Sequence, residues 1–91
     1  MSSIDLERIK AALDQNHKWP SVYMFKFIVP SDNEKIAQVE ALFNSKTAEI
    51  KMNQSKTGKF TSVTAKEVMM SADAVLEYYE NAARIEGLIS L

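Results

Sequence analysis

The sequence predicts an α+β fold: a four-stranded antiparallel sheet with two helices on one face, plus an extra N-terminal helix. Three observations support this prediction. A Thr57-Gly58 pair separates two strand-like runs, other segments alternate in polarity, and further segments repeat apolar residues at helical spacing. The chain has 91 residues, enough for one domain with one hydrophobic core.

The N-terminal helix is predicted over residues 2–16, where Leu6, Ile9 and Leu13 recur at helical spacing. A helix of this length is marginal alone, so it must bury these residues if it is ordered. The surfaces open to it are the uncovered face of the sheet and a neighbouring subunit, and we expect it to lie on the uncovered face. A passive, frayed arm is the alternative.

A break at residues 16–20 separates this helix from the rest of the chain, because Pro20 disfavours helical conformation at the residue before it. We therefore divide the chain into a helical extension at residues 1–18 and a sheet domain at residues 19–91. His17, the single histidine, lies in this junction. It has no cysteine or carboxylate cluster beside it, so we expect a surface residue, not a ligand or a base.

The first strand is predicted over residues 22–29, because alternate residues form two distinct faces. The face that should meet the helices is fully apolar and consists of Tyr23, Phe25, Phe27 and Val29. The opposite face is interrupted only by Lys26. A strand that is apolar on both sides apart from one lysine is typical of the centre of a sheet.

The first crossover helix follows Pro30. Ser31 and Glu34 have the spacing of a capping box, which predicts that Ser31 caps this helix. The apolar stripe of the helix consists of Ile36, Val39, Leu42 and Phe43. Asn44 is a suitable left-handed residue at its C-terminal end.

The hairpin strands are predicted over residues 47–55 and 59–69, because Gly58 accepts the positive φ that tight hairpin turns demand. This turn pairs Met52 with Val63, Ile50 with Ala65, Glu49 with Lys66 and Lys51 with Thr64. The hairpin then has one apolar face and one polar face with an opposite-charge pair. A slip of one residue would destroy this segregation.

The last predicted elements are a helix capped by Ser71 and a short strand at residues 88–91, separated by Gly87. The helix has an apolar face made of Val75, Leu76, Tyr79, Ala82 and Ala83. Right-handed crossovers then favour a ferredoxin-like βαββαβ sandwich with the sheet order four-one-three-two. In this arrangement the core should contain Phe25, Phe27, Ile50, Met52 and Val63.

The composition argues against several classes of function. The formal net charge is −1, whereas nucleic-acid-binding domains usually carry a basic surplus. The lack of cysteine excludes disulfides, thiol nucleophiles and thiolate metal sites, and it fits a reducing compartment. No apolar run approaches the roughly 18 residues of a membrane span, and the N-terminus lacks a signal-peptide pattern. We expect a cytoplasmic protein without a cofactor, a metal, or a membrane or nucleic-acid partner.

The uncovered face of the sheet is the candidate interaction surface. Its polar residues are Lys26, Lys51, Asn53, Ser62, Thr64 and Lys66, beside Met24 and Glu49. An RNA-recognition domain would need a second stacking aromatic residue where Ser62 stands. The loop after the first strand has neither the glycine nor the arginine of a phosphate cradle. The Glu49–Lys66 pair is ordinary surface chemistry, so we do not expect an enzyme.

Residues 19–91 also resemble a known family. The resemblance rests on the stretch Ser55-Lys56-Thr57-Gly58-Lys59-Phe60-Thr61-Ser62-Val63-Thr64, on Pro20 followed by Tyr23-Met24-Phe25-Lys26, and on Tyr79 near the final Gly87-Leu88-Ile89-Ser90-Leu91. These features resemble the YbeD-like family, a bacterial domain of unknown function. The resemblance implies a ferredoxin-like fold similar to ACT regulatory domains and singles out Lys26 and residues 62–64. It implies no established activity, and the loop at residues 30–33 lacks the glycine that ACT domains usually have at their amino-acid site.

Two functions stay open at this point. The first is a non-catalytic regulatory or protein-interaction domain that works through the uncovered face of the sheet, with an unknown protein partner. The alternative is an ACT-like domain that senses an amino acid or another small metabolite as a homodimer.

Overall fold

The described residues, 3–44 and 46–91 of a computed structural model, form three helices and four strands. In chain order these elements are α1 (Ser3–Asn16), β1 (Ser21–Pro30), α2 (Asn33–Glu40), β2 (Glu49–Gln54), β3 (Phe60–Met69), α3 (Ala72–Ala82) and β4 (Ile89–Ser90). Residue 2, which the predicted first helix includes, lies outside the described residues.

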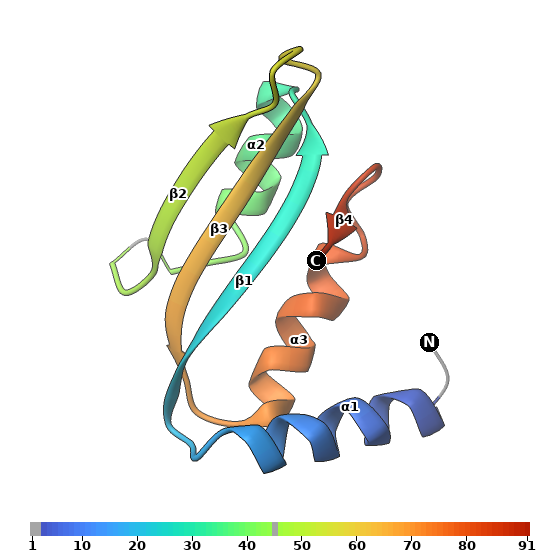
Figure 1. Ribbon diagram of the computed structural model, residues 1–91, viewed down its shortest axis with the longest axis vertical. Coiled ribbons are helices and arrows are strands. Elements are labelled where there is room, and N and C mark those ends of the chain that lie inside the picture. The colour runs from blue at the N-terminus through green and yellow to red at the C-terminus, as the bar shows by residue number, and fades with distance from the viewer. Residues whose placement is uncertain (1–2, 45) are drawn as a thin grey trace.

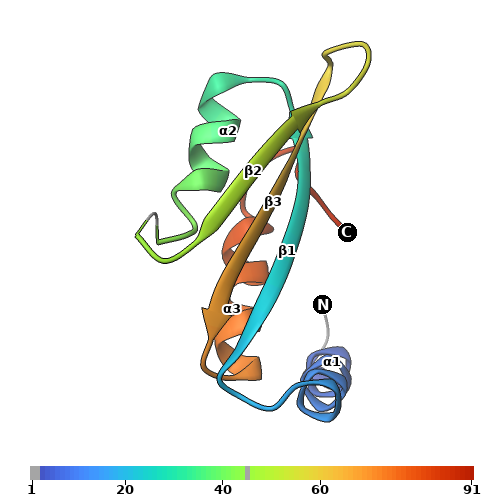
Figure 2. The same ribbon diagram turned by 60° about the vertical axis from the view of Figure 1, so that its left-hand side comes forward.

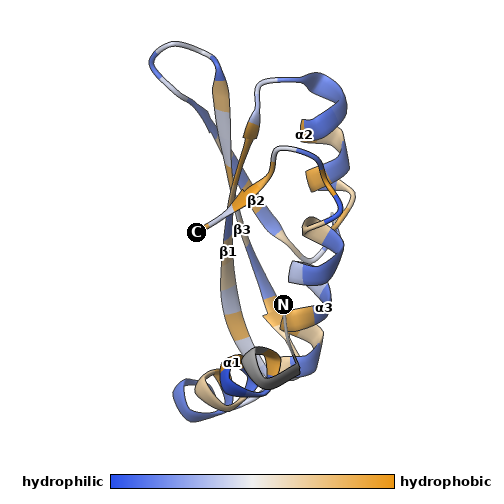
Figure 3. Cartoon of the chain, turned by 90° about the vertical axis from the view of Figure 1, so that its right-hand side faces the viewer, coloured by the Kyte–Doolittle hydropathy of each residue, from blue (hydrophilic) through white to orange (hydrophobic). Residues whose placement is uncertain are grey.

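The four strands form one antiparallel sheet in the order β2-β3-β1-β4 (Figure 1). The predicted order and the central place of the first strand are therefore confirmed. α2 and α3 lie on the same face of the sheet, as Figures 2 and 3 show from two further sides. We call the opposite face, which points away from α2 and α3, the open face.

The predicted hairpin register is confirmed in all four pairs, from Glu49 opposite Lys66 to Met52 opposite Val63. Gly58 has a φ of 74°, the left-handed conformation that the turn prediction requires. Gly87 also has a positive φ, 82°, at the turn that leads into β4. Ser71 caps α3 as expected, because its side chain accepts a hydrogen bond from the backbone N–H of Ala74.

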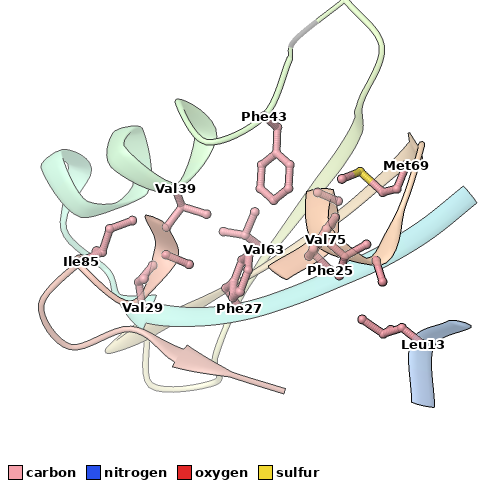
Figure 4. Packing of buried hydrophobic residues seen from close by; sticks show 13 residues of the cluster. Leu13, Phe25, Phe27, Val29, Val39, Phe43, Val63, Met69, Val75 and Ile85 are labelled. Carbon is pink, nitrogen blue, oxygen red and sulfur yellow. The ribbon is translucent and has the colours of Figure 1, made fainter. Parts of the chain in front are cut away.

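The hydrophobic core lies between the sheet and its two covering helices (Figure 4). Its largest fully buried side chains are Phe25, Phe27, Val29, Val39, Val63 and Val75. The Phe25 ring lies 5.5 Å from that of Phe43, which follows α2. The prediction was wrong for Met52, which is 39% exposed. β2 is an edge strand, so its inward-facing side chains have strand neighbours on one side only.

The residues predicted to cap the two ends of α2 were also wrong. Asp32 is the N-cap, and its side chain accepts from the backbone N–H of Glu34 at 2.8 Å. The hydroxyl group of Ser31 instead bonds that of Thr61 on β3, at 2.8 Å. Asn44 does not adopt the predicted left-handed conformation. Among the described residues, only glycines have a positive φ.

The expected position of the first helix was wrong as well. α1 does not lie on the open face; it crosses the end of the molecule where β1 begins and packs against α3 (Figure 1). Leu13 joins the hydrophobic core, and Lys10 forms an exposed ion pair with Asp73 of α3 at 3.3 Å. The indole N–H of Trp19 donates to Asp14 at 2.9 Å, which holds the junction against the end of α1.

Candidate functional site

The open face brings all six sequence-predicted surface residues together. Because the register of three strands is continuous, their outward-facing residues form cross-strand rows. The central row consists of Lys51, Thr64 and Lys26. The row nearer the hairpin turn consists of Asn53, Ser62 and Ile28, and the row on the other side consists of Glu49, Lys66 and Met24.

The charge of the open face is positive although the net charge of the chain is −1. Its three lysines, at positions 26, 51 and 66, are all exposed, and Glu49 lies in the same rows. We expected Glu49 to form an ion pair with Lys66, and this prediction was wrong. Glu49 pairs instead with Lys51, two residues along the same strand, at 3.8 Å. Both side chains are largely exposed, so this pair contributes little to stability.

Apolar side chains flank the lysines on the open face. Val22 and Val68 are opposite each other on β1 and β3, and they are 60% and 55% exposed. Ile89 of β4 lies beside Ile28 and is 53% exposed. Met24 had been placed on this face from the sequence, but Val68 and Ile89 had not. Their signal was present, because period-two alternation assigns both residues to the outward face.

A buried carboxylate forms the second notable polar feature. Glu67 of β3 faces the helices and is only 6% exposed. It accepts hydrogen bonds from the hydroxyl groups of Tyr78 and Thr47 and from the backbone N–H of Asn44. Burial, followed by the hydrogen bond to Glu67, raises the pKa of Tyr78 to about 12. The cluster ties α3 and the loop after α2 to the sheet, which is a structural role.

The remaining candidate groups of the sequence form no metal-binding cluster in the described part of the chain. His17 is half-buried and stacks on Trp19, with ring centroids 5.1 Å apart. Within residues 3–44 and 46–91, no group of three or more His, Asp and Glu side chains could hold a metal ion. No helix described here is both long enough and apolar enough to cross a bilayer.

Comparison with known proteins identifies a family for this chain. The family model described as a protein of unknown function, DUF493, matches residues 14–90 of the chain. The chain belongs to the DUF493 family. This family is the YbeD-like group, so the resemblance seen in the sequence is confirmed. No curated protein and no solved structure matches this DUF493 domain, and membership of this family of unknown function shows no specific role.

Proposed function

We propose that this DUF493 domain is a non-catalytic interaction domain of regulatory type that binds a protein partner through the open face of its sheet. The observation that carries the proposal is the composition of this face. Exposed Val22, Met24 and Val68 lie at one end, Ile89 lies on the β4 side, and three lysines lie between them. Protein interfaces bury apolar side chains at their core and place polar groups at their rim, and this face offers both kinds of contact.

The charges indicate the chemistry of the partner. The open face carries three lysines and one carboxylate, that of Glu49, which is already paired with Lys51. A partner that presents acidic side chains next to apolar ones is complementary to this surface. Two copies of the open face brought together would instead place lysines against lysines, which is unfavourable. We therefore favour an acidic protein surface over self-association at this site.

The positions of the other polar groups support binding over catalysis. Both carboxylate oxygens of Glu67 accept hydrogen bonds, and the Asp32 side chain caps α2. The hydroxyl groups of Ser31 and Thr61 bond each other at 2.8 Å. These groups therefore have structural partners, whereas the three lysines of the open face are exposed and, among the described residues, only Lys51 forms an ion pair.

The test is affinity capture from lysate of the native cell with three immobilised proteins. They are the wild type, a variant with Lys26→Glu, Lys51→Glu and Lys66→Glu, and a control with Lys18→Glu, Lys46→Glu and Lys56→Glu. The control changes the net charge equally at exposed positions outside the open face. We expect a protein that the wild type and the control retain and the open-face variant loses.

The captured protein is then purified and titrated against the same three proteins. Its affinity for the wild type should fall as salt concentration rises, because charged surfaces are screened. If all three proteins bind it equally, or if the wild type captures nothing, the open face is not the interaction surface.

A second candidate, the ACT-like sensing domain, is favoured by one feature. Between α1 and α3 lies a cleft of about 530 Å³, within the size range of metabolite sites. Its charged residues of both signs, including Lys10, Asp73 and Arg84, match a zwitterion such as an amino acid. A thermal-shift screen with single amino acids separates the two functions, since a ligand that binds the folded state raises the Tm. A shift that Arg84→Ala removes supports sensing, and no shift with any amino acid contradicts it.

A further inference from the structure

A second surface, separate from the open face, lies along the edge of β1. β1 pairs with β3 over its whole length, but β4 pairs with it only at Phe27 and Ile28. The backbone N–H of Leu91 donates to the carbonyl group of Lys26 at 2.9 Å and ends this ladder. Residues 21–25 of β1 therefore have no strand partner on the β4 side among the described residues.

The ladder shows which backbone groups point to this edge. In an antiparallel strand, the N–H and C=O groups of every second residue point to the same side. Since the Lys26 carbonyl group points toward β4, the backbone groups of Met24 and Val22 point there too. The Ser21 hydroxyl lies 3.4 Å from the Val22 carbonyl oxygen, a long contact that leaves the edge largely free.

An apolar groove lies directly beside this edge. It has a volume of about 370 Å³ and is lined mainly by Ile9 of α1, Tyr23 of β1, Leu76 and Tyr79 of α3, Ala83 at the C-cap of α3, and Leu91. The hydroxyl groups of Tyr23 and Tyr79 bond each other at 3.0 Å, so neither phenol is left without a polar partner there. The groove thus offers apolar surface next to a row of free backbone donors and acceptors.

The ends of this edge restrict what can occupy it. β4 and Leu91 close one end, and α1 closes the other (Figure 1). The open length is residues 21–25, about 16 Å at roughly 3.3 Å per residue. A single extended segment fits between these ends. The edge of a second whole sheet meets β4 and α1 before it can pair.

We propose that this edge binds an extended apolar segment of a partner protein, which adds a short strand to the sheet beside β1. Strand addition of this kind obtains affinity from main-chain hydrogen bonds and specificity from alternate side chains. Residues of the segment opposite Phe25 and Tyr23 point into the groove and are apolar. Those opposite Met24 and Val22 point outward beside two exposed apolar side chains.

The experiment starts from a phage-displayed library of random linear peptides selected on the folded wild-type protein. We expect enriched peptides with apolar residues at alternate positions, and amide exchange that slows at Met24 when the best synthetic peptide binds. Met24→Pro removes the edge donor at a position whose N–H does not serve the β1–β3 ladder, so the fold tolerates it. This variant should weaken binding by about tenfold or more. Met24→Ala keeps the N–H and loses only the outward side chain, so it should weaken binding much less than Met24→Pro does.

Ala83→Trp provides a second variant, because Ala83 is exposed and its larger replacement fills the groove. It should also weaken peptide binding about tenfold, without any change at the backbone edge. The proposal is overturned if no peptide is enriched, or if the selected peptide binds Met24→Pro as tightly as Met24→Ala. It is also overturned if the lysine variant of the open face, and not the edge variants, loses the peptide. A wild-type dimer in sedimentation velocity that Met24→Pro dissociates would assign the edge to a second copy of this chain instead.

Discussion

The hydrogen bond between Glu67 and Tyr78 allows a quantitative test of the buried polar cluster. We consider Glu67→Gln, Tyr78→Phe and the double variant. The Glu67→Gln side chain keeps an oxygen for Thr47 and Asn44 but loses the negative charge, and hydrogen bonds to charged groups contribute about 1 kcal/mol more than neutral ones. Tyr78→Phe leaves one buried carboxylate oxygen without its donor. We therefore expect each single change to cost about 1–3 kcal/mol of unfolding free energy.

The double variant measures the interaction itself. Because both single changes remove the same bond, the double variant should cost about 1 kcal/mol less than the two single costs combined. Urea unfolding at neutral pH gives the unfolding free energies of the wild type and the three variants. If the dependence of these free energies on urea concentration is the same in all four proteins, the unfolded state is unchanged. Costs that add to within about 0.3 kcal/mol would refute the reasoning, since independent sites behave in that way.

The same pair has a pH dependence whose sign follows from the raised pKa of Tyr78. The folded value is about 12 and the ordinary value is 10.0, so the unfolded chain loses this proton first. Below the unfolded value the contribution is fully present. As pH rises through 10 toward 12, the unfolding free energy should fall. Tyr78→Phe removes this contribution, so the unfolding free energy of the variant should fall less steeply with pH than that of the wild type. An equally steep fall in both proteins would contradict this prediction.

Three further changes test the core, the turn and the first helix by urea unfolding. Phe27→Ala should cost about 3–5 kcal/mol, because the ring is fully buried between Phe25, Phe43 and Tyr79; a loss below about 1 kcal/mol would contradict the burial. Gly58→Val should cost about 1–2 kcal/mol through its positive φ alone, since no atom lies within 4 Å of the added Cβ, and Gly58→Asn should cost less. Leu13→Ala should cost about 2 kcal/mol because α1 joins the core there, whereas Lys10→Ala, in an exposed pair, should change stability by less than about 0.5 kcal/mol.

The sheet could be predicted well because its constraints are local or periodic. A glycine at position 58 fixes the turn, and the turn fixes the hairpin register. The two-sided apolar pattern of β1 then requires a central place in the sheet. The six surface residues follow from the same register, since alternation alone determines which side chains share the open face.

The features that the sequence did not predict depend on choices between near-equivalent groups. Ser31 and Asp32 are adjacent and both can cap a helix; the Thr61 hydroxyl, distant in the chain, engages Ser31 and leaves the cap to Asp32. The stripe of α1 shows which residues must be buried but not against which surface. Its contact with α3 depends on where the end of α3 lies after the whole sheet has formed.

The buried carboxylate was missed although a signal was available. Residue 67 has the same parity as Val63 and Ala65, so alternation assigns it to the inward face of β3. An inward-facing glutamate requires donors, because a buried charge without them is strongly unfavourable. The sequence does not name those donors, since Thr47 and Tyr78 reach it from separate elements.

The two-residue β4 has a consequence for the order of folding. The hairpin pairs residues close in sequence, beginning with Gln54 and Thr61, whereas Phe27 pairs with Ser90 at a distance of 63 positions. Closing long loops costs more entropy, so we expect the hairpin to form early and the β4 contact to form last. Until then the whole edge of β1 is unprotected, and such edges promote aggregation. On a ribosome β4 is synthesised after the other three strands, so we expect the nascent domain to be most exposed to wrong pairing just before β4 emerges.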